Sequence, residues 1–196
     1  MATDEEIVEV TLSADEYDRL RDVTDDPAAM VREATLGRVK LEEAIAFTRD
    51  GGFRESMGRE RMTGEPIPRP PVGELVGFDV EAVADGESRL TFEAGPEHAN
   101  PMGTLHGGIV CDVGDAAMGT AYASTLEEDE SFTTLELSVN YLRPVWSGRL
   151  EAVGRVVERG STIGFVECDV TTEEGKRVAR LSSTCMTLRE DRAAGR

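Results

Sequence analysis

The chain has 196 residues, which is enough for one domain with its own hydrophobic core and no need of disulfides or metal ions. Its 39 acidic and 21 basic residues give a formal net charge of -18, and such a field disfavours nucleic acid as a partner. No apolar run approaches the roughly 18 residues of a membrane span, and the start MATDEEIVEV lacks the features of a secretion signal. We therefore expect a cytoplasmic protein that binds neither nucleic acid nor membrane.

The cations are almost all arginines, because Lys40 and Lys176 are the only lysines. An acidic, lysine-poor surface favours a protein that works in high salt, where counterions screen the repulsion between carboxylates. The alternative is an acidic cytosolic protein without this adaptation. The melting temperature measured against KCl separates the two, since indifference to salt contradicts the first interpretation.

Three cysteines, Cys111, Cys168 and Cys185, are an odd number and form no CxxC pair. Each has apolar or β-forming neighbours in the sequence. This pattern predicts buried free thiols in a reducing compartment.

The first elements of the chain predict an accessory arm. Residues 7–12 have the pattern of a short strand, and Ser13 and Glu16 form an S-x-x-E capping box at the start of a helix. A strand followed by two helices resembles a ribbon-helix-helix DNA-binding arm. The acidity of the segment argues against DNA binding and favours an accessory helical arm.

Asp26 and Pro27 predict the N-cap and first position of a second helix. A further helical pattern at 41–46 is interrupted by glycines at 51–52. Four prolines within residues 64–73 predict an extended lead-in, because proline fixes its own φ and restricts the residue before it. We assign residues 1–71 to this accessory segment.

Residues 72–190 predict a single α+β domain, and residues 191–196 a disordered tail. The element order is ββαββββ, in which one alanine-rich, largely buried helix packs against a long antiparallel sheet that wraps around it. The predicted strands are 77–83, 88–94, 132–142, 149–158, 162–172 and 177–188, and the predicted helix is 107–124.

The stretch HANPMGTLHGGIVCDVGD, residues 98–115, contains both histidines of the chain. At the predicted helix start, Gly107 and Gly108 offer backbone N–H groups with no side chain in the way. The positive end of the helix dipole adds to them, so a carbonyl oxygen that gains negative charge, or an anion, can bind here. A plain glycine turn is the alternative, and the absence of a Gly-Lys-Ser/Thr sequence excludes a phosphate P-loop.

Two acids and one amide accompany these glycines. Asp115 lies in a mostly apolar helix, where an unpaired carboxylate is costly. Asp112 lies one turn away, so one of the two acids can be a base while the other is solvated, or both can point to solvent. Asn100 lies in the preceding loop, where its amide can donate a second hydrogen bond to the same oxygen or simply form a turn.

Helix geometry sets a limit on these groups. Gly107 and Asp115 are eight residues apart, which is about 12 Å along a helix, so they cannot both touch one reacting carbon in the same subunit. If both act on one substrate, the second group comes from another copy of the chain across a two-fold axis. This reasoning predicts a homodimer with two composite sites.

The sequence resembles the hot-dog-fold acyl-CoA thioesterases of the phenylacetate-pathway type (PaaI-like). The resemblance rests on NPMGTLHGG at 100–108, the acid at Asp115 and TTLELSVNYLRP at 133–144, and it covers residues 72–188. It implies a long antiparallel sheet wrapped around one central helix. It also implies hydrolysis of an acyl-CoA, expected to be aryl- or medium-chain, to the free acid and CoA.

The same resemblance implies roles for site residues. The Gly107 amide and the Asn100 side chain polarise the thioester carbonyl, and Asp115 of the facing subunit activates water or attacks directly. Thr134 helps to place the water or the carboxylate. His106 orients the loop or binds near the thioester.

No cofactor is expected, because CoA is part of the substrate. No catalytic metal is expected either, because the two histidines form no HExxH or H-x-x-x-H pattern. Gly108 and the turn residue Ser161 are further substrate-binding candidates. For the CoA phosphates the candidates are Arg143 and Arg159, with Arg180 as a third, although each can equally be a surface ion-pair partner. The partners expected are the acyl-CoA and further copies of the chain, as a homodimer or a dimer of dimers.

Two other functions remain open. One is a non-catalytic acyl-CoA-binding or regulatory hot-dog domain, in which the catalytic carboxylate would not be needed. The other is a hot-dog dehydratase or hydratase, which would carry a catalytic histidine paired with an acid in a different motif. The joint presence of Asn100, Gly107, Asp115 and Thr134 favours the thioesterase.

Overall fold

The computed structural model describes residues 9–50, 68–127 and 129–189. The chain divides into two compact units, residues 1–41 and 42–196, and each is described by itself. The predicted tail at 191–196, the glycines at 51–52 and the first part of the proline-rich stretch lie outside the described residues.

The N-terminal region contains α1 (Ala14–Val23) and the start of α2 (Pro27–Arg49). The predicted capping box is confirmed, because the Ser13 side chain accepts from the Glu16 backbone while the Glu16 carboxylate accepts from the Ser13 backbone. The predicted N-cap at Asp26 is also confirmed by its side chain, which accepts from the Ala29 N–H at 2.9 Å. Neither helix contains a buried residue.

Three details of the accessory segment differ from the predictions. The pattern at 41–46 is not a separate helix but the second half of α2, which continues through Gly37 because one glycine weakens a helix without ending it. Residues 9–12 are not a strand, since no neighbouring strand pairs with them, and residues 7 and 8 lie outside the described range. The predicted extended stretch already becomes helical at α4 (Pro71–Val76), where proline is tolerated at the first helical position.

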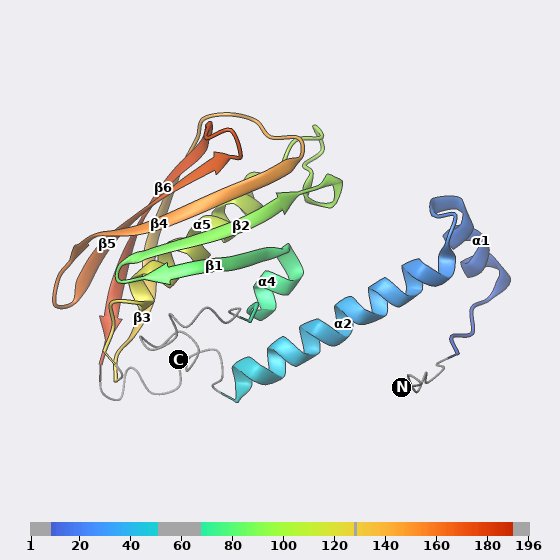
Figure 1. Ribbon diagram of the computed structural model, residues 1–196, viewed down its shortest axis with the longest axis horizontal. Helices are drawn as coiled ribbons and strands as arrows, with labels where there is room; N and C mark the ends of the chain where they lie inside the picture. The colour runs from blue at the N-terminus through green and yellow to red at the C-terminus, as the bar shows by residue number, and fades with distance from the viewer. Residues whose placement is uncertain (1–8, 51–67, 128, 190–196) are drawn as a thin grey trace, which may run out of the picture. The chain divides into compact units, whose positions relative to one another are not determined.

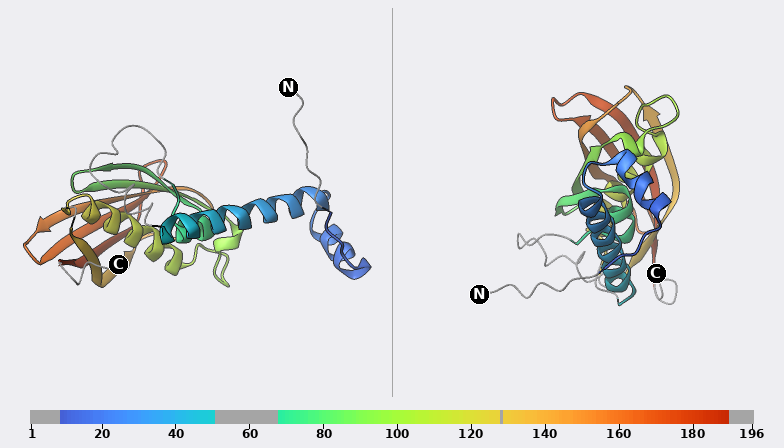
Figure 2. Two further views of the ribbon diagram at one scale, coloured as in Figure 1. Left: turned by 90° about the horizontal axis from the view of Figure 1, so that it is seen from below. Right: turned by 90° about the vertical axis from the view of Figure 1, so that its right-hand side faces the viewer.

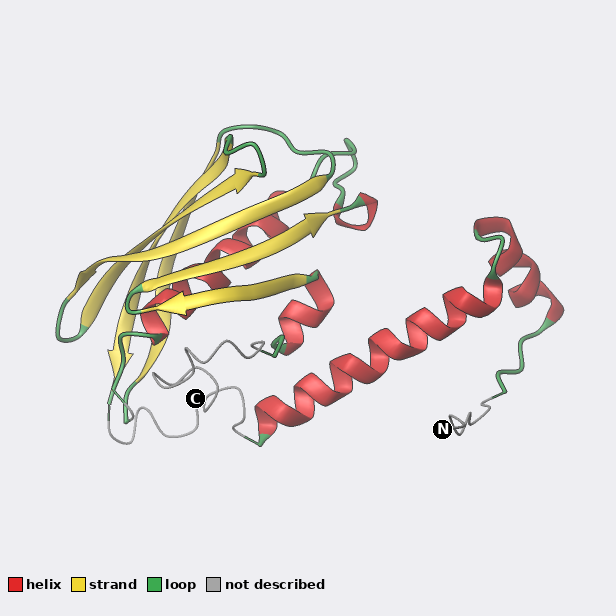
Figure 3. Ribbon diagram, viewed as in Figure 1, coloured by secondary structure: helices red, strands yellow, loops and turns green. Residues whose placement is uncertain are grey.

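The C-terminal unit forms the predicted antiparallel sheet, and every predicted strand is found to within two residues at each end. Its six strands lie in the spatial order β1-β2-β4-β5-β6-β3 (Figures 1 and 3). The strands are β1 (Phe78–Ala84), β2 (Glu87–Ala94), β3 (Ser131–Tyr141), β4 (Gly148–Arg159), β5 (Ile163–Thr172) and β6 (Arg177–Leu188). In this order β3 occupies one edge of the sheet and β1 the other.

Helix α5 (Gly107–Ala123) lies along one face of the curved sheet, as Figure 2 shows. Small residues allow the two layers to approach closely: a Cβ on Gly154 of β4 would lie 2.5 Å from the Ala117 carbonyl oxygen, and one on Gly114 would lie 2.5 Å from the Leu181 side chain. Ser88 of β2 donates its hydroxyl to the same Ala117 oxygen at 2.6 Å. The middle of the central helix is therefore packed closely against the sheet.

The hydrophobic core lies between α5 and the sheet. It includes Val113 and Met118 of the helix and Leu90, Val166 and Leu181 of three strands. The predicted burial of Cys168 and Cys185 is confirmed, whereas Cys111 is only half-buried because it lies on the first turns of α5 near solvent. Among the described residues, no helix is both long and apolar enough to cross a bilayer.

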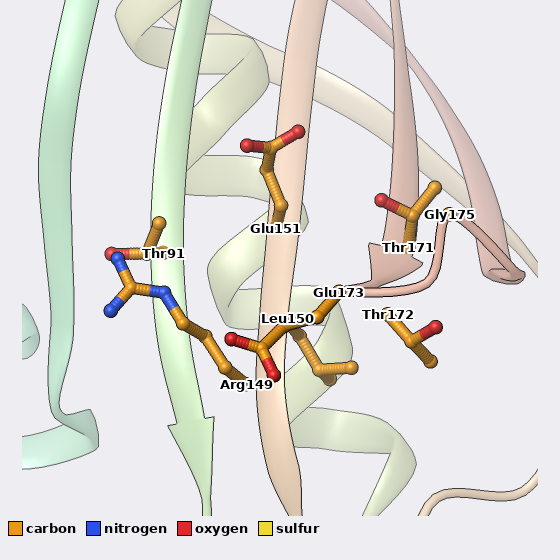
Figure 4. A pocket seen from close by; sticks show the side chains of 8 residues that line it. All are labelled: Thr91, Arg149, Leu150, Glu151, Thr171, Thr172, Glu173 and Gly175. Carbon is orange, nitrogen blue, oxygen red and sulfur yellow. The ribbon is translucent and has the colours of Figure 1, made fainter.

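A shallow hollow lies on the sheet near the turn between β5 and β6. Figure 4 shows its lining side chains, which come from β2, β4, β5 and that turn, and they include Thr91, Arg149 and Glu151. Arg149 is already paired with Glu81 at 3.1 Å. None of the predicted catalytic residues lines this hollow.

Candidate active site

The start of α5 is capped by its own preceding histidine. His106 has an extended backbone, and its Nδ1 accepts a hydrogen bond from the Gly108 N–H at 2.9 Å. A ring nitrogen that accepts carries no proton, so the neutral ring has its proton on Nε2. His106 therefore caps the start of α5, while the roles that the resemblance implies, orienting the loop or binding near the thioester, stay predictions.

The Gly107 N–H is left available. The first amides of a helix have no partner within the helix. The His106 ring nitrogen accepts from the Gly108 N–H, and the His106 carbonyl oxygen accepts from the Ile109 N–H at 3.1 Å. Within the described part of the chain, no acceptor is recorded for the Gly107 N–H. The sequence expectation of an open donor at the positive end of the helix dipole therefore fits Gly107. It is wrong for the Gly108 N–H, because His106 already accepts its hydrogen bond.

Tyr141, the last residue of β3, contacts the same helix start. Its hydroxyl donates to the Gly107 carbonyl oxygen at 2.8 Å and lies 3.3 Å from Cys111 Sγ. The sequence analysis assigned no role to Tyr141, although it lies within the string that carries the resemblance. Its position beside Gly107 could not be read from the sequence, because 34 residues separate the two.

Asn100 organises the loop before the helix. Its side-chain oxygen accepts from the N–H groups of Met102 at 2.9 Å and Thr104 at 3.3 Å, and its amide nitrogen donates to Thr104 Oγ1 at 2.9 Å. The side-chain amide has a second N–H for which no partner is recorded among the described residues. Asn100 makes no hydrogen bond to His106 or Gly107 in the described part of the chain, so its predicted contact with substrate stays a prediction.

His98, the other histidine, has a structural role. Its Nδ1 accepts from the Gly95 N–H at 3.0 Å, its Nε2 lies 3.1 Å from the Val76 carbonyl oxygen, and its ring packs against Phe92 at 4.8 Å between centroids. The His106 N–H in turn donates to the His98 carbonyl oxygen at 2.9 Å. His98 thus anchors the loop that delivers His106 to the helix.

Asp115 lies half-buried on α5 and accepts a hydrogen bond from Thr134 Oγ1 at 3.3 Å. Burial raises the pKa of its carboxyl above the usual range, the Thr134 hydroxyl partly offsets this rise, and the negative charge of Asp112 adds to it. A raised pKa makes the carboxylate a better proton acceptor. Asp112 is exposed, so the structure favours Asp115 as the acid with a chemical role.

A β-bulge shapes the strand that carries Thr134. In the pairing of β3 with β6, Thr134 faces Cys185 and Glu136 faces Thr184, which leaves Leu135 as the extra residue. A bulge twists its strand and changes the direction of nearby side chains, and bulges are common beside active sites. The sequence contained no glycine or other signal that would have revealed this one.

The residues around α5 therefore form two clusters, and Tyr141 is the one member to which the sequence analysis assigned no role. The carbonyl cluster comprises Asn100, His106, Gly107, Gly108 and Tyr141 at the start of α5, and the carboxylate cluster comprises Asp115 and Thr134. Eight residues, about 12 Å along the helix, separate Gly107 from Asp115. One chain does not bring the clusters together.

The arginines expected to bind phosphate differ in their surroundings. Arg159 lies over the Tyr122 ring at 5.1 Å and pairs with Glu130 at 3.0 Å, at the far end of α5 from Gly107. Arg180 pairs with Glu167 at 2.6 Å. Arg143 is exposed and donates to the Arg177 carbonyl oxygen, and it makes no ion pair with the residues that the structure describes. Ser161 is exposed in the turn after Arg159.

Comparison with known proteins places this architecture in a family. The family model of the thioesterase superfamily matches residues 102–179, which include the carboxylate cluster and most of the carbonyl cluster. A candidate esterase of Halobacterium salinarum is 39% identical over 103 residues, which cover 50% of this chain and 68% of that protein. The chain belongs to the thioesterase superfamily.

Other relatives of this thioesterase agree with the assignment. The crystal structure of a thioesterase family protein from Silicibacter pomeroyi superimposes with a TM-score of 0.58 at 29% identity, over 62% of this chain and 92% of that one. Acyl-coenzyme A thioesterase 13 of Pongo abelii is 27% identical over 101 residues, which cover 50% of this chain and 71% of that protein. The hot-dog fold and the family expected from the sequence are therefore confirmed.

Proposed function

We propose that the protein hydrolyses acyl-CoA thioesters to a free acid and CoA, with aryl or medium-chain acyl groups as the expected substrates. The single observation that carries this proposal is the pairing of an open N–H at Gly107 with a half-buried, hydroxyl-bonded carboxylate at Asp115 on the same helix. A thioester hydrolase needs both parts, a donor for the carbonyl oxygen and a group that activates the nucleophile. One relative is an acyl-coenzyme A thioesterase by name, which supports acyl-CoA as the substrate class of this protein.

The proposed reaction uses each cluster for one task. The Gly107 N–H, with the free amide N–H of Asn100, binds the thioester oxygen and stabilises its negative charge as the carbonyl carbon becomes tetrahedral. Asp115 accepts a proton from the attacking water, which Thr134 helps to place, and returns it to the CoA thiolate when the C–S bond breaks. Direct attack by Asp115, with an anhydride intermediate that water then hydrolyses, is the second route.

A second copy of the chain supplies the missing cluster in this proposal. Among the described residues, no strand pairs with the outer edge of β3. Leu135 and Tyr141 of this strand and the following Leu142 have side chains that are at least half exposed. Such an edge offers free backbone donors and acceptors for pairing with another copy. A two-fold axis at this edge makes two equivalent sites, each with Gly107 of one subunit and Asp115 of the other.

Arg143 is the strongest candidate for the CoA phosphates. It follows Tyr141 and Leu142 at the end of β3, next to the carbonyl cluster, and its exposed guanidinium is not committed to an ion pair among the described residues. Arg159 and Arg180 would first have to leave Glu130 and Glu167. The charge reversal Arg143→Glu is expected to raise KM for acyl-CoA without a matching fall in kcat.

The test is release of free CoA, followed with a thiol reagent against phenylacetyl-, hydroxybenzoyl- and straight-chain acyl-CoAs. A reaction of the enzyme alone with the reagent provides the background, because Cys111 is half-exposed. Multiple turnovers with at least one substrate class support hydrolysis. Binding of acyl-CoA without turnover would instead favour the non-catalytic binding domain, and would reject the proposed function.

A further inference from the structure

The contact between Tyr141 and Gly107 joins two elements that are distant in sequence. The Tyr141 hydroxyl is at the end of β3, and it reaches the carbonyl oxygen of the first residue of α5 at 2.8 Å. Because the hydroxyl binds a backbone oxygen, the contact orients the first peptide group of the helix and not a neighbouring side chain. A movement of the Tyr141 side chain therefore changes the position of the Gly107 backbone.

The peptide group between Gly107 and Gly108 is held at both of its polar atoms. Tyr141 binds its carbonyl oxygen, and His106 Nδ1 binds its N–H at 2.9 Å. Because a peptide group is planar, fixing both atoms fixes the plane. The preceding peptide group, which carries the open Gly107 N–H, can then rotate only about the bonds at the Gly107 Cα.

We propose that Tyr141 is a positioning residue, which aims the Gly107 N–H at the oxygen of the bound thioester. The inference rests on the proposed function and adds a residue to it. Tyr141 acts through the backbone of Gly107 and does not itself touch the reacting atoms.

The absence of a side chain at Gly107 is part of the same arrangement. A Cβ at this position would lie 2.7 Å from Tyr141 Oη and 2.8 Å from Cζ, closer than side chains approach. Only glycine therefore lets the tyrosine hydroxyl reach the backbone. Close approach of another group to the backbone is an established reason for glycine at a position.

The hydroxyl remains a donor over the working pH range. The Tyr141 ring is half exposed, but loss of water around its hydroxyl, together with the neighbouring Cys111, raises the pKa of Tyr141 to about 12. Its one proton is directed to the Gly107 carbonyl oxygen, so the Cys111 thiol is the donor in the contact between sulfur and oxygen at 3.3 Å. Cys111 supports the tyrosine but is not needed for the bond to Gly107.

The decisive variant is Tyr141→Phe, which keeps the ring and removes the hydroxyl. Without the hydroxyl, the Gly107 N–H is held less firmly toward the thioester oxygen, and it stabilises the transition state less. We therefore expect kcat to fall about tenfold or more while KM changes less than about threefold. The variant Cys111→Ala, in which the hydroxyl keeps its bond to Gly107, is expected to retain kcat within about twofold. Wild-type kcat in Tyr141→Phe overturns the inference.

Tyr122→Phe is the matched control. It removes a tyrosine hydroxyl from the other end of α5, where that hydroxyl lies 2.8 Å from Thr187 Oγ1 in the core. We expect a lower melting temperature with unchanged kcat, the opposite of the pattern expected for Tyr141→Phe. Equal losses of kcat in both variants would show a general effect of weakened packing and overturn the positioning role.

The amide resonance of Gly107 in a ¹H–¹⁵N NMR spectrum tests the inference without any turnover. Loss of the Tyr141 hydroxyl is expected to shift this resonance and speed its hydrogen exchange, while Gly37 in α2 serves as the unaffected reference. If the wild type hydrolyses no thioester, the proposed function fails, and the NMR measurement alone then tests the positioning. An unchanged Gly107 resonance in Tyr141→Phe overturns it.

Discussion

The two ends of α5 differ in how fully their polar groups are hydrogen-bonded. At the C-terminal end the Tyr122 hydroxyl pairs with Thr187 at 2.8 Å, Ser124 accepts from the Gly86 N–H at 2.9 Å, and Thr125 donates to the Tyr122 carbonyl oxygen at 2.7 Å. At the N-terminal end the Gly107 N–H has no recorded partner in the described chain. The satisfied end stabilises the domain, and the open end is where a ligand can complete the hydrogen bonding.

The acidic side chains near the C-terminal end and in the middle of α5 also differ, because one is paired with arginines and the other is not. Near the C-terminal end, Glu130 is held by both Arg159 and Arg189, and the Arg159 guanidinium covers the Tyr122 ring. Midway along the helix, Asp115 has a long hydrogen bond from Thr134 and no ion pair with the part of the chain that the structure describes, and burial raises its pKa. A carboxylate left without a cation in a half-buried place lowers stability, so its presence indicates a functional use.

The largest expected effect is that of Asp115→Asn. Removal of a proton-accepting group lowers rates by about 10²- to 10⁴-fold, so we expect a loss of this size in kcat for acyl-CoA hydrolysis. The melting temperature should not fall, because the change removes a half-buried charge whose raised pKa shows that the fold disfavours it. The control is Asp112→Asn at the exposed acid one turn away, with nearly wild-type kcat. Comparable activity in the two variants would contradict the assignment of Asp115.

A smaller effect is expected from Thr134→Val on the pH dependence. Asp115 must be ionised to accept a proton, so activity falls as the pH drops through its raised pKa. The Thr134 hydroxyl stabilises the ionised form, and its removal raises the pKa further. The acid limb of a kcat/KM profile should therefore move to higher pH in the variant. A limb that stays in place or moves to lower pH would exclude this hydrogen bond from the mechanism.

Glu130→Gln tests the satisfied end and should have the smallest effect. It weakens the contacts with the partly buried Arg159 and the exposed Arg189. One charged hydrogen bond of this kind contributes about 1 kcal/mol after allowance for solvent screening. We expect the melting temperature to fall by about 2–4 °C while kcat is unchanged. A loss of kcat with no change in melting temperature would mean that this end also takes part in the reaction.

The fold was largely predictable from the sequence because its signals are local. Strand alternation, turns such as Asp85-Gly86 and the small, apolar pattern of residues 107–124 identified the sheet and its helix to within two residues. The helix arithmetic between Gly107 and Asp115 also needed no structure. In the accessory segment, by contrast, α2 proved continuous and α4 began inside the proline-rich stretch, because glycine and proline weaken or permit a helix according to position.

What the sequence could not reveal were contacts between distant residues. Tyr141 approaches Gly107 only because β3 forms the sheet edge beside the start of α5, and Arg159 has neighbours in Glu130 and Tyr122 that its turn sequence did not indicate. The exposure of Cys111 has the same origin, since burial depends on which side of the helix faces the sheet. Residue types and spacing identified the chemistry, and the packing determined which groups are free to perform it.

The most direct test of the account is a mixture of two inactive variants, Asp115→Asn and Gly107→Pro. Proline removes the Gly107 N–H, and it is tolerated at the first helical position. The extended backbone of His106 is the conformation that a residue before proline prefers. The Tyr141 side chain must move to make room for the proline ring. Circular dichroism and native mass spectrometry establish that both variants fold and exchange subunits. With sites shared across a two-fold axis, half of the dimers carry one intact site, and activity should recover to about a quarter of wild type. No activity above that of the separate variants, with mixed dimers present, would contradict a composite site.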